Sequence, residues 1–299
     1  KRKSVVLAYD PANEKVLLFG GEGASKSLKN DTWLWDGHAG EWTEVNVAGA
    51  VPSPRAGAQM AYDGQNLVLF GGYTYASGKQ QPLGDTWIWN GSEWTEAGTP
   101  VSPPATYWGQ MAFDGQTAVL YGGITGNVTV HHDGTNQDIT IKDSSPDLWI
   151  WNAGLQSWSS VSGPEGFGRW GHTMAYDGRR VVFFSGQRDY IHIDGQSFPD
   201  LKMPSAMYPY PRTSLAYGWH NGSWERVPQL GSMAAYYDDV GFPGAVQLWP
   251  NQVPFPLSNA SMAFDGTNFI IFGGHRDEVE VRDKHQIQGG ILRFKVSAG

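Results

Sequence analysis

A single phrase recurs along the whole chain, and it constrains the fold more than any other feature. Its most complete copy runs from Met60-Ala61-Tyr62-Asp63-Gly64 through an apolar run to Gly71-Gly72, and then to Asp85-Thr86-Trp87 and Trp94. The other copies begin at Leu7, Met111, Met174 and Met262. Self-similarity with such a period is typical of propellers and solenoids, whose units pack only against their neighbours.

Each copy divides into four short strands, which we name a to d. Strand a turns at Asp-Gly, a dipeptide that readily adopts the positive φ of a two-residue hairpin. Strand b is a continuous apolar run that ends in a glycine pair, as expected where the backbone approaches a neighbour closely. Strand c carries aromatic residues two positions apart, such as Trp87 and Trp89, and strand d begins at a Trp such as Trp94. The sequence therefore predicts an all-β protein of four-stranded units.

These residues resemble the kelch repeat. The glycine pair, the Asp-Thr-Trp strand and the following Trp occur in the kelch order, and Pro54-Arg55-Ala56-Gly57 and Arg169-Trp170-Gly171-His172 are similar to the kelch Pro-Arg-x-Gly lead-in. The resemblance covers nearly the whole chain. It implies a β-propeller whose blades surround a central axis.

The spacing of the glycine pairs predicts five blades in one domain that spans residues 1–299. The first residue of each pair falls at 20, 71, 122, 185 (a Ser) and 273, at intervals of 51, 51, 63 and 88 residues. The blades then start near residues 5, 58, 109, 172 and 260. A sixth blade near 233–238 is less consistent with the spacing, because too few residues separate it from Met262. The last unit lacks a closing Trp strand, so it is a three-stranded blade or the chain belongs to a longer protein.

Composition limits the classes of partner and the cellular locations to be expected. The net charge is −8 and no Lys or Arg cluster occurs along the sequence, which argues against nucleic acid. No apolar run is long enough for a membrane span, and the first residues do not resemble a signal peptide. We expect a soluble monomer, for which secreted and periplasmic locations remain open.

The chain has no cysteine. This excludes disulfides and thiolate metal ligands. It also excludes the cysteine–tyrosine copper-radical centre that a resemblance to oxidases of the galactose oxidase type would imply.

The long connections should share one face. In a four-stranded unit the b–c and d–a connections lie on the opposite side from the short a–b and c–d turns. The long connections are the b–c segments 73–84, 124–146, 187–213 and 275–288 and the d–a segment 228–259. Long loops on a rigid scaffold commonly carry function, so we expect the ligand on this face, which we call the long-loop face.

Histidines and carboxylates are frequent on these segments. The candidate ligands of a divalent metal are His131, His192, His275 and His285. The candidates for acid–base or metal-dependent catalysis are His192, His275, His285, Asp194 and Asp277. The alternative is that these side chains are simply solvated.

Other residues of the same face are candidates for direct ligand contact. Arg188 and Arg276 could hold an anion, and a further set could stack on or border a ligand: Tyr190, Trp108, Trp170, His172, Tyr208 and Trp249. For Trp108 and Trp170 the alternative is packing between blades.

Three functions remain open from the sequence. The first is a binding module for a glycan, peptide or protein. The second is an enzyme acting on a carbohydrate or another polar small molecule at the same face. The third is a structural propeller within a longer protein. Propellers serve all three purposes, so the fold alone does not decide.

Overall fold

The structure, a computed structural model, describes residues 1–132, 137–164, 168–188, 216–227, 258–266, 269–275 and 291–294. Within these ranges every regular element is a β-strand except the single 3-10 turn η1 (Ala24–Lys26). All strand pairs are antiparallel. The all-β prediction is therefore confirmed for the part of the chain that the structure describes.

Four sheets have four strands each, in the order predicted for a repeat unit. The first contains β1 (Val6–Asp10), β2 (Lys15–Phe19), β3 (Thr32–Asp36) and β4 (Glu41–Val45). The second contains β5 (Gln59–Tyr62), β6 (Leu67–Phe70), β9 (Thr86–Trp89) and β10 (Trp94–Ala97). The third contains β11 (Gln110–Phe113), β12 (Ala118–Tyr121), β15 (Asp147–Asn152) and β16 (Ser157–Ser162). The fourth contains β18 (Thr173–Tyr176), β19 (Val181–Phe184), β21 (Ala216–His220) and β22 (Ser223–Arg226).

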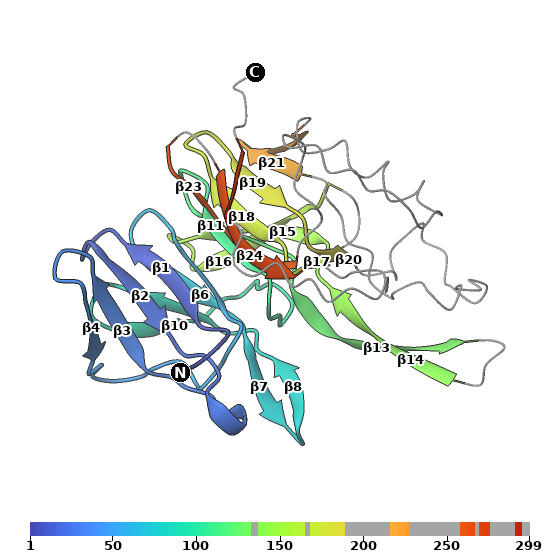
Figure 1. Ribbon diagram of the computed structural model, residues 1–299, viewed down its shortest axis with the longest axis horizontal. Helices are drawn as coiled ribbons and strands as arrows, with labels where there is room; N and C mark the ends of the chain where they lie inside the picture. Colours follow the sequence, from blue (N-terminus) through green and yellow to red (C-terminus); the bar gives the residue numbers. More distant parts are fainter. Residues whose placement is uncertain are drawn as a thin grey trace.

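A fifth sheet has three described strands: β23 (Ser258–Phe264), β24 (Phe269–His275) and β25 (Ile291–Phe294). The first strands of the five sheets lie beside one another in chain order, from β1 through β5, β11 and β18 to β23. Figure 1 shows the sheets following one another in this way. The number of blades and the closure of a ring stay predictions.

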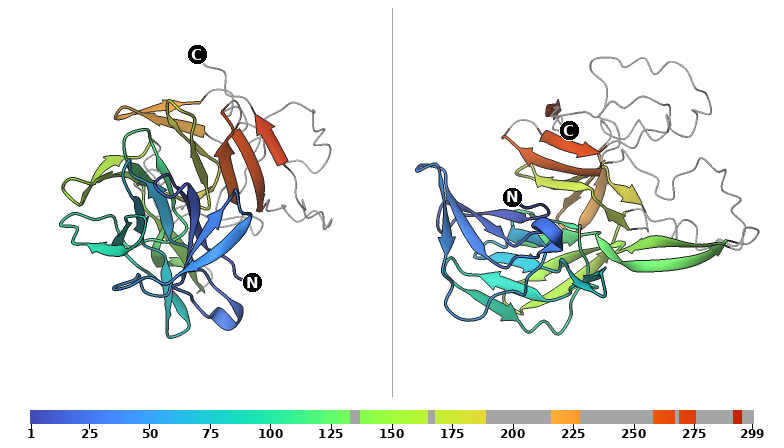
Figure 2. Two further views of the ribbon diagram at one scale, coloured as in Figure 1. Left: turned by 90° about the vertical axis from the view of Figure 1, so that its left-hand side faces the viewer. Right: turned by 60° about the horizontal axis from the view of Figure 1, so that its bottom comes forward.

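Two of the expected long loops are β-hairpins. They are β7 (Tyr73–Ala76) with β8 (Lys79–Pro82), and β13 (Ile124–His132) with β14 (Gln137–Ser144). Figures 1 and 2 show both ribbons extending from the body of the protein. A further pair joins β17 (Arg169–Trp170) to β20 (Gln187–Arg188).

The glycine pairs occupy the backbone conformation that the sequence predicted. Gly71 and Gly72 have φ of +64° and +97°, and the second amide donates to the carbonyl of Thr106 in the next repeat at 2.8 Å. The amide of Gly21 donates in the same way to the carbonyl of Arg55 at 2.8 Å. A Cβ on Gly20 would come within 2.7 Å of that carbonyl oxygen, so a side chain there is excluded by both strain and contact.

A buried arginine holds the start of a repeat against its own third strand. Arg55, with 1% of its surface exposed, donates to both carboxylate oxygens of Asp85 at 2.7 and 2.6 Å and to the carbonyl of Gly71 at 3.0 Å. In the third repeat the corresponding residue is Thr106. The bidentate pair is therefore not a feature of every repeat.

The hydrophobic core lies between adjacent sheets. Phe19 of the first sheet packs edge-on against Trp94 of the second, with ring centroids 5.3 Å apart. The Trp94 indole N–H also donates to Thr32 Oγ1 of the first sheet at 3.0 Å, and Trp158 donates to Thr86 in the same way at 3.1 Å. Burial of apolar area and a repeated hydrogen bond thus join the first sheet to the second and the second to the third.

Removing this repeated hydrogen bond should weaken the packing between the second and third sheets. We expect Thr86→Val to lower the free energy of unfolding by about 1–3 kcal/mol, because the buried Trp158 N–H would lose its acceptor. Urea unfolding followed by circular dichroism measures the change. The control is Thr95→Val at an exposed position of β10; equal destabilisation of the two variants would contradict the prediction.

Candidate functional site

The lead-in segments of the repeats meet on the long-loop face. Each lead-in forms a short antiparallel bridge with the residue that follows its glycine pair: Lys3 with Glu22, Ala56 with Tyr73, Tyr107 with Ile124, and Trp170 with Gln187. The hairpins β7–β8 and β13–β14 begin at these bridges, and β8 lies against β13. The residue after each glycine pair therefore lies where the long connections leave the sheets.

Backbone hydrogen bonds join successive lead-ins into an inner chain. The amide of Gly57 donates to the carbonyl of Ser4 at 2.9 Å, that of Trp108 to Gly57 at 3.0 Å, and that of Gly171 to Trp108 at 3.2 Å. All four residues have positive φ, between +52° and +65°. Glycine adopts this conformation freely, whereas a bulky side chain rarely does.

Trp108 is therefore strained at a position where the neighbouring repeats have glycine. Its φ is +58°, and its ring lies over Gly57, where an added Cβ would come within 2.8 Å of the indole. The ring stacks on Trp170 with centroids 6.2 Å apart and planes 29° from parallel. Trp108 is partly exposed, whereas Trp170 is buried. Strain of this kind persists only when the surroundings hold it, and it often marks a functional position.

Five rings from the second to the fourth repeat form what we call the aromatic cluster: Tyr73, Tyr75, Tyr107, Trp108 and Trp170. Tyr73 meets Tyr75, Tyr107 and Trp108 edge-on, with centroids 5.7, 5.2 and 6.1 Å apart. Tyr73 and Tyr107 are buried, and Tyr75 and Trp108 are partly exposed. The cluster thus has a rigid interior and two rings that reach solvent.

A buried carboxylate from the first repeat anchors the cluster. Glu22 is 5% exposed and accepts hydrogen bonds from the hydroxyls of Tyr73 at 2.6 Å and Tyr75 at 3.0 Å, and Lys3 Nζ lies 3.3 Å away. Burial alone would raise the pKa of Glu22, but the two tyrosines and Lys3 outweigh it and hold the pKa below its usual range. Burial, together with the hydrogen bond to Glu22, raises the pKa of Tyr73, so this hydroxyl remains a donor.

His172, a candidate for ligand contact, lies inside the protein. It is 1% exposed and its ring meets Tyr121 edge-on, with centroids 5.5 Å apart. Burial, with the nearby positive charge of Arg169, lowers the pKa of His172 to about 3. Neither ring nitrogen has a hydrogen-bond partner among the described residues. The imidazole is therefore neutral at physiological pH and does not reach the surface.

The structure describes only the backbone of three other candidates. Arg188 pairs with Arg169 in β20, His131 pairs with Asp138 across the β13–β14 hairpin, and His275 ends β24 opposite Ser258. The remaining candidates lie outside the described residues: Tyr190, His192, Asp194, Tyr208, Trp249, Arg276, Asp277 and His285. Among the side chains that are described, no group of three or more His, Asp or Glu could hold a metal ion. The metal and catalytic assignments stay predictions.

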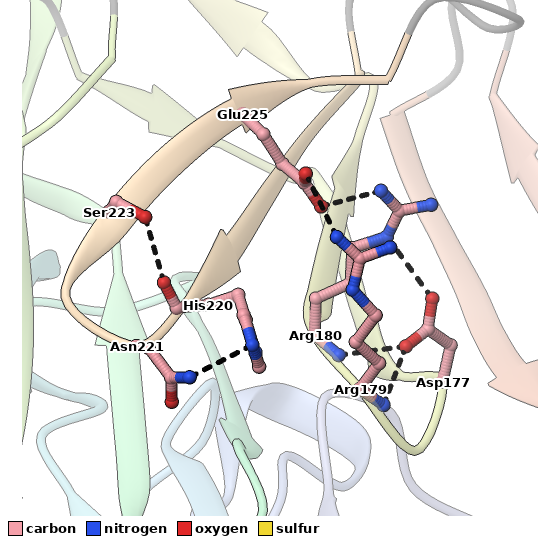
Figure 3. Close-up of polar contacts among 7 residues, drawn as sticks. All are labelled: Asp177, Arg179, Arg180, His220, Asn221, Ser223 and Glu225. Atoms are coloured by element: carbon pink, nitrogen blue, oxygen red, sulfur yellow. Dashed lines mark hydrogen bonds and ion pairs between the residues drawn. The ribbon is translucent and has the colours of Figure 1, made fainter. Parts of the chain in front are cut away.

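The opposite face carries an ion-pair network that connects strands of the fourth sheet. Arg180, 8% exposed, lies between Asp177 and Glu225, with nitrogen–oxygen distances of 3.2 and 2.5 Å (Figure 3). Gly218 makes room for it, since a Cβ there would come within 2.8 Å of the Arg180 side chain. The network therefore joins the turn between β18 and β19 to β22, and each of these charges already has a partner.

Sequence reasoning missed Glu22, Tyr73 and Tyr75. Their place in the repeat could have indicated a role at this face, because Glu22 and Tyr73 each directly follow a glycine pair. The two hydrogen bonds among them join residues about fifty positions apart, in adjacent repeats. No pattern within one repeat predicts them.

The fold and this face define an all-β repeat protein with interacting lead-in segments. Residues 5–203 match the KLHDC2/KLHL20/DRC7 Kelch-repeats domain, so the chain belongs to the kelch-repeat family and the resemblance seen in the sequence is confirmed.

The chain is also similar to larger curated proteins. Adagio-like protein 1 of Oryza sativa subsp. japonica is 31% identical over 180 residues, which is 58% of this chain and 26% of that protein. Adagio protein 3 of Arabidopsis thaliana is 26% identical over 187 residues, 60% of this chain and 28% of that protein. tRNA wybutosine-synthesizing protein 4 of Aspergillus fumigatus is 35% identical over 91 residues, 30% of this chain and 8% of that protein. The chain spans about a quarter of the length of the adagio relatives.

Across the described residues, no helix has the length and hydropathy required to cross a membrane.

The strain at Trp108 can be measured by comparing two truncations. Trp108→Gly and Trp108→Ala both remove the ring, but only glycine adopts φ of +58° without penalty. We expect the glycine variant to be more stable than the alanine variant by about 1–2 kcal/mol in urea unfolding.

The control for this comparison is the same pair of substitutions at Trp42 in β4, where φ is not positive. There alanine should be the more stable, because glycine loses more backbone entropy on folding. The same order of stability at both sites would contradict the strain at Trp108.

The Glu22 contacts should give a defined pH dependence. Because the folded state lowers the pKa of Glu22, the stabilisation is complete above the ordinary value of 4.5 and is lost as pH falls through the lower folded value. Wild type should therefore be more stable than Glu22→Gln at neutral pH, and the difference should narrow below pH 4.5. Urea unfolding across this range measures it, with the exposed Glu93→Gln variant as control. A difference that does not change with pH would contradict the role of the carboxylate.

Proposed function

We propose that this chain is a protein-binding module, built as a five-bladed kelch propeller, that takes a peptide segment of its partner on the long-loop face. Membership of the kelch-repeat family supports a protein partner. The similarity to the adagio relatives covers only about a quarter of their length, so it supports a module and not a complete activity.

The observation that carries the proposal is the conformation of Trp108. A partly exposed indole stands where the second and fourth repeats have glycine. The backbone angle at this position disfavours every residue except glycine. Nothing in the inner chain of hydrogen bonds requires the ring, because Gly57 and Gly171 make the same backbone contacts. A side chain that is retained in spite of strain is expected to serve binding.

The surroundings of Trp108 fit an anchor residue for a protein partner. Trp and Tyr dominate the binding energy of many interfaces, and they do so best when neighbours fix their orientation. Trp170 stacks on one side of the indole, and Tyr73 and Tyr107 meet it edge-on. The ring is therefore ordered before any partner binds.

The test is selection of linear peptides from a phage-displayed library on the immobilised chain. Selected peptides are synthesised with a fluorescent label, and their Kd values are measured by anisotropy for the wild type, Trp108→Gly and Trp42→Gly. We expect Trp108→Gly to weaken binding about thirtyfold, the usual effect of truncating an aromatic anchor.

Trp42 is 42% exposed on β4, outside the aromatic cluster, so Trp42→Gly should bind as the wild type does. Glycine is chosen at position 108 because it relieves the strained backbone. Failure to select any peptide, or equal binding by Trp108→Gly, would contradict the proposed function.

A further inference from the structure

Two lysine-bearing segments that are far apart in the sequence come together beside the aromatic cluster. Lys26 Nζ lies 4.9 Å from the centre of the Tyr75 ring and 3.5 Å from the carbonyl of Gly78 at the tip of the β7–β8 hairpin. Lys79 is the next residue and begins β8. Lys29 comes from the same connection as Lys26, and its side chain would lie 3.8 Å from a Cβ on Gly23. Figure 1 shows the turn η1 beside the β7–β8 hairpin.

We call Lys26, Lys29 and Lys79 the basic rim. All three are exposed, and none forms an ion pair with another described residue. No sequence pattern predicts the rim, because these lysines are separated by up to 53 positions.

The carboxylates close to the rim are already engaged. Glu22 is buried against Tyr73, Tyr75 and Lys3. Asp31 is bound by Arg2 at 2.5 and 2.8 Å. The rim is therefore a positive surface in a chain whose net charge is −8. Since screening limits electrostatic attraction to about 8 Å at physiological salt, a ligand at the rim responds to these lysines more than to the net charge.

We propose that the basic rim and the aromatic cluster together bind an acidic peptide segment, whose carboxylates lie on Lys26, Lys29 and Lys79 while a neighbouring apolar side chain packs on Tyr75 and Trp108. This inference rests on the proposed function and specifies the chemistry of the partner. Charge complementarity of this kind raises the association rate and selects the partner.

An acidic peptide fits these contacts better than a nucleic acid does. The exposed cations of the rim are all lysines, which act as point charges, and the arginines nearby, Arg2 and Arg55, already hold Asp31 and Asp85. Single-stranded nucleic acids bind by stacking bases on open aromatic faces. The Trp108 ring is already stacked on Trp170.

The experiment uses four labelled probes and two double variants. The probes are a twelve-residue peptide with one Trp and six Glu, the same peptide with Gln in place of Glu, the same peptide with Lys in place of Glu, and a twelve-nucleotide polyuridine RNA. The variant is Lys26→Glu/Lys79→Glu. The control is Lys15→Glu/Arg179→Glu, which makes the same change in net charge on the face of the short turns. Anisotropy gives Kd at low and physiological salt.

We expect the Glu peptide to bind the wild type at least about tenfold more tightly than the Gln peptide, and the Lys peptide to bind most weakly. The rim variant should lose that preference, the control variant should keep it, and salt should reduce it. Trp108→Gly should weaken the Glu and Gln peptides alike, since the ring contacts the apolar side chain.

Three results would overturn the inference. If the Glu and Gln peptides bind equally well and both bind more weakly to Trp108→Gly, the partner is not acidic, and the proposed function stands. Binding of RNA that the rim variant abolishes, without binding of the Glu peptide, would make the rim a phosphate-binding surface. No binding of any of the three peptides, together with failure of the library selection, would reject both the inference and the proposed function.

Discussion

The described lead-ins of the long-loop face are positioned by one repeated backbone hydrogen bond. In the first three repeats the second glycine of the pair donates its amide to the carbonyl of the next repeat's lead-in, from Gly21 to Arg55, Gly72 to Thr106 and Gly123 to Arg169, at 2.7 to 2.8 Å. The close approach is available only because the first glycine of the pair has no Cβ. This contact sets the spacing of neighbouring lead-ins, and the lead-ins carry Tyr107, Trp108 and Trp170.

Most of the fold could be predicted because its determinants are local. Asp63, for example, accepts the amides of Gln65 and Asn66 at 2.9 and 2.7 Å while Gly64 takes φ of +100°, so four consecutive residues specify the turn. The hairpin β7–β8 could have been predicted in the same way, because Ser77-Gly78 forms a two-residue turn between short strands. We expected a loop there because the kelch pattern treats this connection as variable.

The site was predictable only in part, because its contacts cross from one repeat to another. The choice of face and of Trp108 followed from the length of the connections and from residue type. The link from Glu22 to Tyr73 and the meeting of Lys26 with the β7–β8 tip have no counterpart within a repeat. They require the curvature that stacking of the sheets creates, which composition and spacing do not specify. We expected His172 to contact a ligand, but it is buried. Its burial also depends on how neighbouring repeats pack, which the sequence of one repeat does not specify.

The third repeat departs from the repeat pattern at the long-loop face. It has Thr106 where the second and fourth repeats have a buried arginine, and Trp108 where they have glycine. It has Leu148 where the first and second repeats have the threonine that accepts an indole N–H, and the fourth repeat has Ala216 there. The indole of Trp224 instead donates to the carbonyl of Ser162 at 2.9 Å, so the packing adapts to the loss. All three departures lie at the long-loop end of the sheet, beside the β13–β14 hairpin, while the Asp-Gly turn at the other end keeps the common pattern. The departures at Thr106 and Trp108 therefore place a strained, partly exposed indole at the same end of the sheet as the long β13–β14 hairpin.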